Sequence, residues 1–246
     1  MKMTNSITKL PTNGLFTAVV LLAFVAGGAG AAKGDILVNG LLDATSVSSQ
    51  VLATPTGWVV DAFKTVSGPF NDGASSEGFA NVQAPGGMGV FFKPFQGVID
   101  NPITVNLYQD APGTPGAKYT LTAFAGAEAN YSGLAAGTTT KSQLALDFLA
   151  SNNAVIGQSV LDLAAAGLGT VNGQPFGYAE YTVMGTAPAG TVTVRARGSM
   201  IDAYGTSGQQ GFVMDAFNLS SVPEPTTFTF VGLGVIGLAG MRRRRS

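Results

Sequence analysis

The sequence of 246 residues contains no cysteine and no histidine. Without cysteine, the chain can form no disulfide and has no thiolate metal ligand or cysteine nucleophile. Without histidine, it lacks the usual general base near neutral pH and the central member of a Ser-His-Asp arrangement. We therefore expect a protein that is not an enzyme, because any catalysis would depend on carboxylates, lysine, tyrosine or hydroxyl groups alone.

Charged residues are also scarce, at 11% of the chain against 46% hydrophobic residues. This composition argues against a disordered protein and against a nucleic-acid partner. Residues 32–222 hold 13 of the 14 acidic residues and 7 of the 13 basic ones, a net charge of about −6 for this part. We expect a soluble domain that does not bind anionic polymers by charge.

The first 32 residues have the features of a secretory signal peptide. Lys2 and Lys9 precede the apolar run 15–26, and the small residues GGAGAA follow it. The apolar run is short for a membrane-spanning helix, which needs about 20 residues. Residues 1–32 are therefore predicted to direct export through the Sec translocon, and an uncleaved N-terminal anchor is the alternative.

The last 25 residues, 222–246, combine three elements in a fixed order. Val222, Pro223, Glu224 and Pro225 come first, and the prolines keep this stretch extended. An apolar, glycine-containing segment, 226–241, follows and predicts a short transmembrane helix. The chain then carries Arg242, Arg243, Arg244 and Arg245, which the positive-inside rule holds in the cytoplasm, so that the segment stops translocation.

These three elements together resemble the PEP-CTERM sorting signal of bacterial surface proteins. The resemblance implies that an exosortase, a membrane-embedded processing enzyme, is a partner and cleaves near the Pro-Glu-Pro motif. It also implies transient anchoring in the inner membrane and a final location at the cell surface or in the extracellular matrix. A plain C-terminal membrane anchor is the alternative interpretation.

Between the two ends, residues 33–221 predict a single all-β domain, a β-sandwich. Short segments rich in β-branched and aromatic residues recur between turn-forming clusters. One stretch, 158–168, predicts a short helix or turn. The candidate strands are 35–38, 57–62, 89–93, 103–109, 117–125, 142–149, 178–184, 191–199 and 211–219.

Several short motifs in this domain resemble the galactose-binding-like jelly roll of carbohydrate-binding modules. They are VNGLLD, GWVVD, APGTPGAKYTLTAFAG, SQLALDFLASNNAVIGQS, TAPAGTVTVRAR and FVMDAFNLSS, in this order. The resemblance implies a jelly-roll sandwich that binds carbohydrate, here an extracellular polysaccharide or exopolysaccharide of a biofilm matrix. A structural surface protein that only packs or self-associates is the alternative.

The resemblance also implies a structural calcium ion held by carboxylates of the first and last strands. The matching residues are Asp43, where the family usually has Glu, and Asp215, with Asn39 nearby. Calcium takes six to eight oxygen ligands, so two carboxylates do not complete a site. Solvated loop carboxylates are the alternative.

Sugar-binding modules stack aromatic side chains on pyranose faces. The candidate ligand-binding residues are Tyr131 and Tyr204, in Gly/Ser-rich loops, and Trp58, whose strand position also suits the core. Tyr178 and Tyr181 are weaker candidates. For catalysis, Asp147 and Glu180 could pair across strands, but chance supplies many such pairs in a chain with scattered carboxylates.

The processing of both ends can be tested by the intact mass of the mature protein. We expect a loss of about 25 residues at each end, because the signal peptide and the sorting segment are both removed. Mass spectrometry of the exported protein measures this directly. A mature protein that retains Arg242–Arg245 would contradict the sorting interpretation.

Overall fold

The structure is a computed structural model that describes residues 34–47, 53–68, 73–78, 87–170, 178–208 and 210–222. The predicted signal peptide, Pro223–Pro225, the apolar segment and Arg242–Arg245 lie outside these residues. Within the described ranges, no helix is long and apolar enough to cross a membrane.

The described residues form an all-β fold of two five-stranded antiparallel sheets and one small two-stranded sheet. The strand order is β10-β7-β12-β5-β4 in one large sheet and β3-β6-β11-β8-β9 in the other, and β1 pairs with β2. The elements are β1 (Thr45–Val47), β2 (Ala53–Pro55), β3 (Val59–Lys64), β4 (Ala74–Glu77), β5 (Gly89–Phe92), β6 (Ile103–Pro112), β7 (Lys118–Ala127), the 3-10 helix η1 (Ser132–Leu134), β8 (Lys141–Leu149), β9 (Val155–Asp162), β10 (Ala179–Thr186), β11 (Thr193–Ala203) and β12 (Phe212–Val222).

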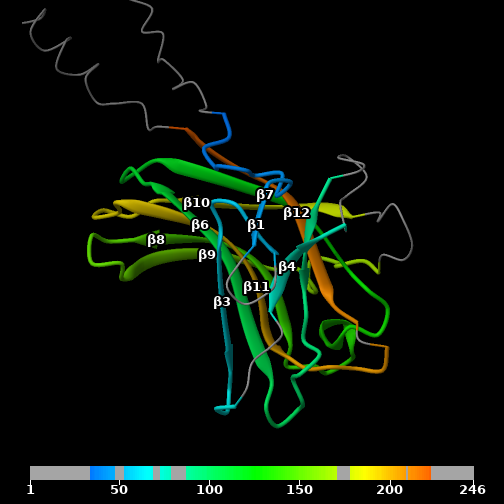
Figure 1. Cartoon of the computed structure of the whole chain (residues 1–246). Helices are drawn as coiled ribbons and strands as arrows, with labels where there is room; N and C mark the ends of the chain where they lie inside the picture. The colour runs from blue at the N-terminus through cyan, green and yellow to red at the C-terminus, as the bar shows by residue number, and fades with distance from the viewer. Residues whose placement is uncertain are drawn as a thin grey trace, which may run out of the picture.

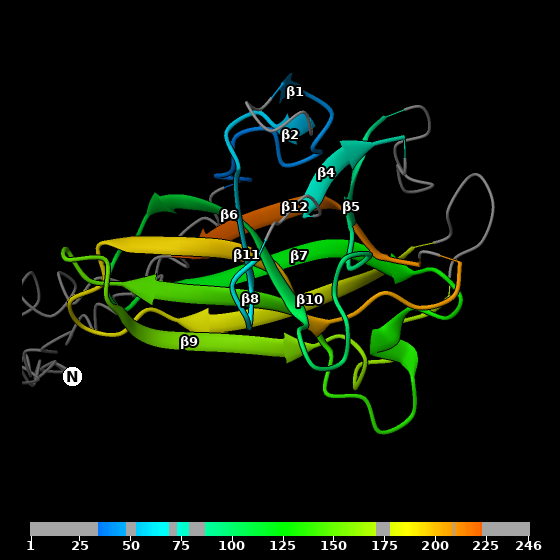
Figure 2. The same ribbon diagram turned by 60° about the horizontal axis from the view of Figure 1, so that its bottom comes forward.

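The two large sheets pack face to face as a single jelly-roll sandwich, as the sequence predicts (Figures 1 and 2). In this packing β10 lies against β8 and β9, and β12 lies against β11. The fold class predicted for this domain is therefore confirmed.

Alternation of side chains along the strands explains why the sheets face each other as they do. In β11, Val194 and Ala196 are fully buried in the core between the sheets. Arg195 and Arg197 alternate with them and lie on the outer face of the sheet. Because successive side chains in a strand point to opposite faces, this short stretch fixes one face as core and the other as polar.

The two ends of the sandwich domain meet on its surface (Figure 1). The amide of Ile36 donates to the carbonyl of Leu219 (2.9 Å), and the amide of Phe217 donates to the carbonyl of Gly40 (2.8 Å). A bulge in β12, where Ala216 has a φ of 49°, allows this contact. A Cβ at position 40 would overlap the carbonyl oxygen of Phe217, so glycine is required there.

Eight of the nine predicted strands are present, with shifted ends. The predicted strand 35–38 is wrong, because this segment forms a turn that bonds to β12. The stretch 158–168 was predicted as a short helix or turn. Its first half instead belongs to β9, and its second half is a turn, in which the amide of Leu168 donates to the carbonyl of Leu163 (2.8 Å). The short strands β1, β2 and β4 are not among the predicted strands.

The described residues of the sandwich include one large buried hydrophobic core. Its members run from Leu42 to Leu219 and come from both large sheets. Trp58 packs on Phe217 with ring centroids 4.8 Å apart, which joins the segment before β3 to the last strand. Because the segment 33–222 contains both sheets and this core, we expect it to fold by itself.

A substitution at the centre of this core tests the packing. Phe217→Ala in the segment 33–222 should lower the free energy of unfolding by about 3 to 5 kcal/mol, because Phe217 is buried and its removal leaves a cavity. Met184→Ala is the control and should change it by less than about 0.5 kcal/mol, since Met184 is 70% exposed. The fluorescence of the single tryptophan during denaturant unfolding measures both, and equal losses would contradict the packing described.

Candidate functional site

Polar side chains gather on the outer face of the sheet β3-β6-β11-β8-β9. They surround a shallow, open hollow of about 250 Å³. The strand register brings them together: Arg195 lies between Asp110 of β6 and Asp147 of β8, and Ser199 lies opposite Asn106. The residues that line the hollow are Asp61, Asn106, Tyr108, Asp147, Gln158, Arg195 and Arg197.

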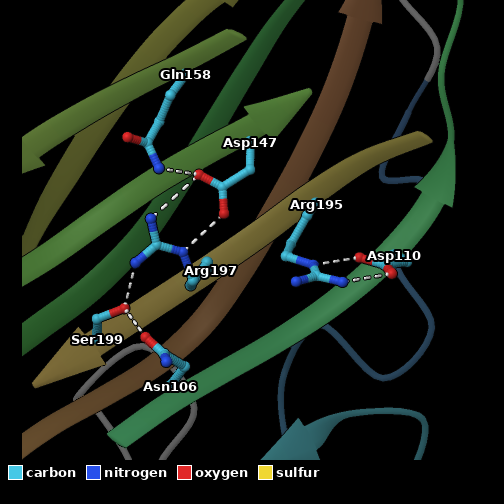
Figure 3. Close-up of polar contacts among 7 residues, drawn as sticks. All are labelled: Asn106, Asp110, Asp147, Gln158, Arg195, Arg197 and Ser199. Carbon is cyan, nitrogen blue, oxygen red and sulfur yellow. Dashed lines mark hydrogen bonds and ion pairs between the residues drawn. The ribbon is translucent and has the colours of Figure 1, made fainter. Parts of the chain in front are cut away.

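Arg197 is the centre of a network that crosses four neighbouring strands (Figure 3). Its Nε and Nη2 donate to the carboxylate of Asp147 at 2.7 and 3.1 Å, and its Nη1 donates to Oγ of Ser199 at 2.5 Å. Nε2 of Gln158 donates to Asp147 (2.6 Å), and Ser199 donates to Oδ1 of Asn106 (2.7 Å). This side-chain network leaves the Asn106 amide nitrogen and the Gln158 carbonyl oxygen unused.

Asp147 and Arg197 are nearly buried although they lie on an outer face. Their side chains are 5% and 12% exposed. A buried charge is tolerated only when it is paired and hydrogen-bonded, and here the carboxylate accepts three hydrogen bonds. The pair is therefore held in one geometry before any ligand binds.

Arg195 forms a second, more exposed pair with Asp110. Its Nε and Nη2 donate to the two carboxylate oxygens at 2.7 and 2.9 Å, a bidentate arrangement. Its guanidinium group also lies over the ring of Tyr108, 3.8 Å from the centroid. The hydrogen bonds with Asp110 raise the pKa of Arg195 above its ordinary value, although burial opposes this shift. The Tyr108 ring face under Arg195 is thus already occupied.

The edge strand β3 completes the site with one charged and two apolar side chains. Asp61 is exposed and lies opposite Asn106 in the sheet. Among the described residues, the structure gives Asp61 no hydrogen-bond or ion-pair partner. Val59 and Phe63 lie on the same face as Asp61 and are 46% and 50% exposed. Phe63 is therefore an open aromatic surface beside the hollow.

Two of the three aromatic residues predicted to bind a ligand lie in the core, which corrects that prediction. Tyr131 is fully buried, and its hydroxyl is hydrogen-bonded to Ser142 (2.9 Å); burial raises the pKa of Tyr131 well above its usual range. Trp58 is 6% exposed and donates to the carbonyl of Asn39 (3.1 Å), as its core interpretation predicts. Neither ring has a face left for a sugar.

Tyr204 is half-buried in the loop after β11 and does not line the hollow. Its amide donates to Oγ of Ser132 (3.4 Å), at the end of the sandwich that carries η1. The weaker candidates Tyr178 and Tyr181 are each 7% exposed. Burial and then the charges of Asp215 and Glu128 raise the pKa of Tyr178. The five aromatic candidates therefore do not form one platform.

The two predicted calcium ligands already bind backbone amides. Asp43 is exposed and accepts from the amide of Met88 (2.7 Å), whereas Asp215 is buried and accepts from the amide of Ala216 (2.6 Å). Within the described ranges, no group of three or more Asp or Glu side chains is placed to hold a metal ion. Calcium at these residues stays a prediction without a complete set of ligands.

Asp147 and Glu180, the pair considered for catalysis, lie on opposite outer faces of the sandwich. Asp147 alternates with the inward-facing Leu146 and Phe148 in one sheet, and Glu180 precedes the inward-facing Tyr181 in the other. They cannot act together on one bond. Val222, the first residue of the predicted sorting motif, is the last residue of β12 and pairs with Lys118.

Of the residues that line the hollow, only Asp147 was predicted as a candidate, and then as a catalytic partner of Glu180. The others are neither acid pairs nor aromatic rings in loops, the two patterns on which the site predictions rest. A signal was present in TVTVRARG, where two arginines alternate with small apolar residues in a strand. Two charges on one face of a central strand require partners on its neighbours. That reasoning predicts acidic residues opposite Arg195 and Arg197, although not which ones.

Comparison with protein families identifies the C-terminal end of the chain. The model of the PEP-CTERM protein-sorting motif matches residues 221–245. The motif implies secretion, processing by an exosortase and sorting to the cell surface, as the resemblance predicted. Comparison with curated proteins gives no match.

Solved structures show a distant likeness in the sandwich. TmCBM61, in complex with β-1,4-galactotriose, has a TM-score of 0.40 at 13% identity over 75% of this chain and 97% of its own. The CBM22-1 xylan-binding domain from Paenibacillus barcinonensis Xyn10C has 0.38 at 10% identity over 77% and 96%. The active domain of bacteriophage CBA120 tailspike protein 4 has 0.49 at 10% identity over 76% of this chain, which spans only 21% of that domain. Likeness at this level does not assign a ligand.

The two arginines offer a matched test of the network. Arg197→Met should lower the free energy of unfolding by about 3 to 4 kcal/mol, because it leaves the nearly buried Asp147 unpaired. Arg195→Met should cost no more than about 1 kcal/mol, since Asp110 is 41% exposed and remains hydrated. Denaturant unfolding of both variants measures the difference, and a smaller loss for Arg197→Met than for Arg195→Met would contradict the burial of the first pair.

Proposed function

We propose that this chain is a secreted surface or matrix protein that binds a neutral polysaccharide on the outer face of the sheet β3-β6-β11-β8-β9. The observation that carries the proposal is the pre-paired polar network (Figure 3). The exposed ring of Phe63 lies two residues from Asp61 on the same face of β3. Guanidinium, carboxylate and amide groups are planar and match the paired hydroxyl groups of a sugar. Because hydrogen bonds already hold these side chains in place, less conformational entropy is lost when a ligand binds.

The charge of the site favours a neutral ligand. Arg195 and Arg197 are each neutralised by an aspartate, so the remaining charge among the lining residues is the negative Asp61. An anionic polymer would meet this carboxylate and a domain with a net charge of about −6. Asp61 can instead accept hydrogen bonds from sugar hydroxyl groups, and Phe63 can pack on the apolar face of a pyranose ring.

The same pairing supports binding without hydrolysis. Glycoside hydrolysis needs two carboxyl groups, one of which must give or take a proton at the scissile bond. Asp110 and Asp147 both hold a guanidinium group, so they are poorly placed for proton transfer. In this proposal the sorting signal delivers the protein across the inner membrane, and the sandwich then holds exopolysaccharide outside the cell.

Binding of the segment 33–222 to a panel of neutral and anionic polysaccharides tests this function. Affinity electrophoresis or a glycan array should show retention by a neutral glycan and weaker retention by an anionic one. Asp61→Ala should weaken that binding about tenfold, because one charge-assisted hydrogen bond is lost. Phe63→Ala should weaken it about fivefold through lost stacking.

Matched control variants lie on the other outer face. Glu180→Ala removes an exposed carboxylate, and Met184→Ala removes an exposed apolar side chain, both from β10. These variants should bind as the unaltered segment does. Retention of full affinity by Asp61→Ala and Phe63→Ala would place the site elsewhere, and no binding to any neutral glycan would overturn the proposed function.

A further inference from the structure

Four strands form the edges of the two large sheets: β3, β4, β9 and β10. An edge strand has a row of unpaired backbone groups that can pair with another chain. Natural proteins prevent this with charged residues, proline, short strands or a covering segment. The four edges here differ in this protection.

On one side of the sandwich, both edges are protected. The edge strand β4 has only four residues and packs against β2. The edge strand β3 carries Asp61 and Lys64. Charges of this kind make the approach of a second strand costly, because they would have to be desolvated.

On the other side, β9 lies at the rim of the sandwich with β10 beside it (Figure 2). Residues 155–161 of β9 contain no charged residue and no proline. The pairing of β9 with β8 is irregular only at its first end, between Phe148 and Leu149, so the remainder is a regular strand. This stretch has neither the charged residues nor the proline that protect other edge strands, so it is open to pairing with another chain.

Apolar side chains are exposed along the same rim. Val155, Ile156 and Val160 of β9 are 53%, 40% and 43% exposed. Within the described part of the chain, no segment pairs with the outer edge of β9. Backbone groups and apolar area are therefore available together at one place.

We infer that β9 pairs antiparallel with β9 of a second copy of this chain, which joins two sandwiches into a dimer. A second copy fits because an antiparallel strand pair has two-fold symmetry, so the uncharged stretch 155–161 is complementary to itself. A register with Gln158 on the axis places Ile156 opposite Val160 of the second copy. No like charges then face each other within 155–161, although the domains repel each other elsewhere.

The dimer would also change how the proposed binding site works, and this step rests on the proposed function. Gln158 of β9 lines the polar hollow, so two paired β9 strands place two hollows on one continuous sheet face. A repetitive polysaccharide could then bind both sites at once. Two linked sites raise the apparent affinity without a new contact.

Sedimentation velocity of the segment 33–222 tests the dimer. Two paired strands bury less area than a standard interface, so we expect a weak dimer that forms at about 10 to 300 µM. Val160→Lys should raise the dissociation constant at least about tenfold, because it places a charge in the apolar contact. Val59→Lys, on the edge strand β3 and at 46% exposure, is the matched control and should leave it unchanged.

The absence of cysteine allows a second, independent measurement. Gln158→Cys places one thiol on the proposed axis, so oxidation should yield a disulfide-linked dimer. Asp61→Cys places a thiol on the opposite edge and should cross-link much more slowly. A segment that stays monomeric to about 300 µM, or Asp61→Cys cross-linking as fast as Gln158→Cys, would overturn the inference.

Measurements of glycan binding distinguish a failure of the proposed dimer from a failure of the proposed function. Val160→Lys should still bind a short neutral oligosaccharide as the unaltered segment does, and should lose only the avidity for a long polysaccharide. A dimer without glycan binding would overturn the proposed function alone. Glycan binding by a strictly monomeric protein would overturn the dimer alone.

Discussion

The register of β11 between β6 and β8 is the constraint on which both the core and the candidate site depend. In this register Val194 and Ala196 fill the space between the sheets, and Arg195 and Arg197 reach aspartates on the neighbouring strands. A slip by one residue would turn both arginines into the core and both apolar side chains to water. The same pairing that buries the core therefore also assembles the polar network.

The sequence was sufficient to predict the fold because most strands carry their own alternation and turn signals. Leu144, Leu146 and Phe148 repeat at every second position, and the observed β8 has its inward face there. The wrongly predicted elements lie where the alternation of apolar and polar residues is weak. The strand β9 reads as Val-Ile-Gly-Gln-Ser-Val and continues into an alanine run, so that short-range propensity suggested a helix. Its pairing with β8 overrides that propensity.

The site was less predictable than the fold, because its residues are brought together by pairing between distant segments. Asp110 and Arg195 are 85 residues apart, and Asn106 and Ser199 are 93 apart. Tyr131 shows the converse problem. Its Gly/Ser-rich surroundings suggested an exposed loop, yet its ring stacks on Phe212 inside the core. The amino-acid composition of a loop does not predict whether that loop folds back over the end of a sheet and becomes buried.

The proposed binding face and the open edge strand β9 share a low density of charge. The described strands contain few basic residues, and both arginines lie in β11, where each is neutralised by an aspartate. Such a face suits neutral, hydroxyl-rich ligands, for which strong fields give little advantage. The same scarcity leaves β9 without the lysine or glutamate that would keep an edge strand apart from other chains. A neutral polar face and an edge strand open to self-pairing both favour many weak contacts over one strong contact. For a protein sorted to a cell surface, several linked weak contacts with a repetitive polymer together hold the protein stably on that polymer.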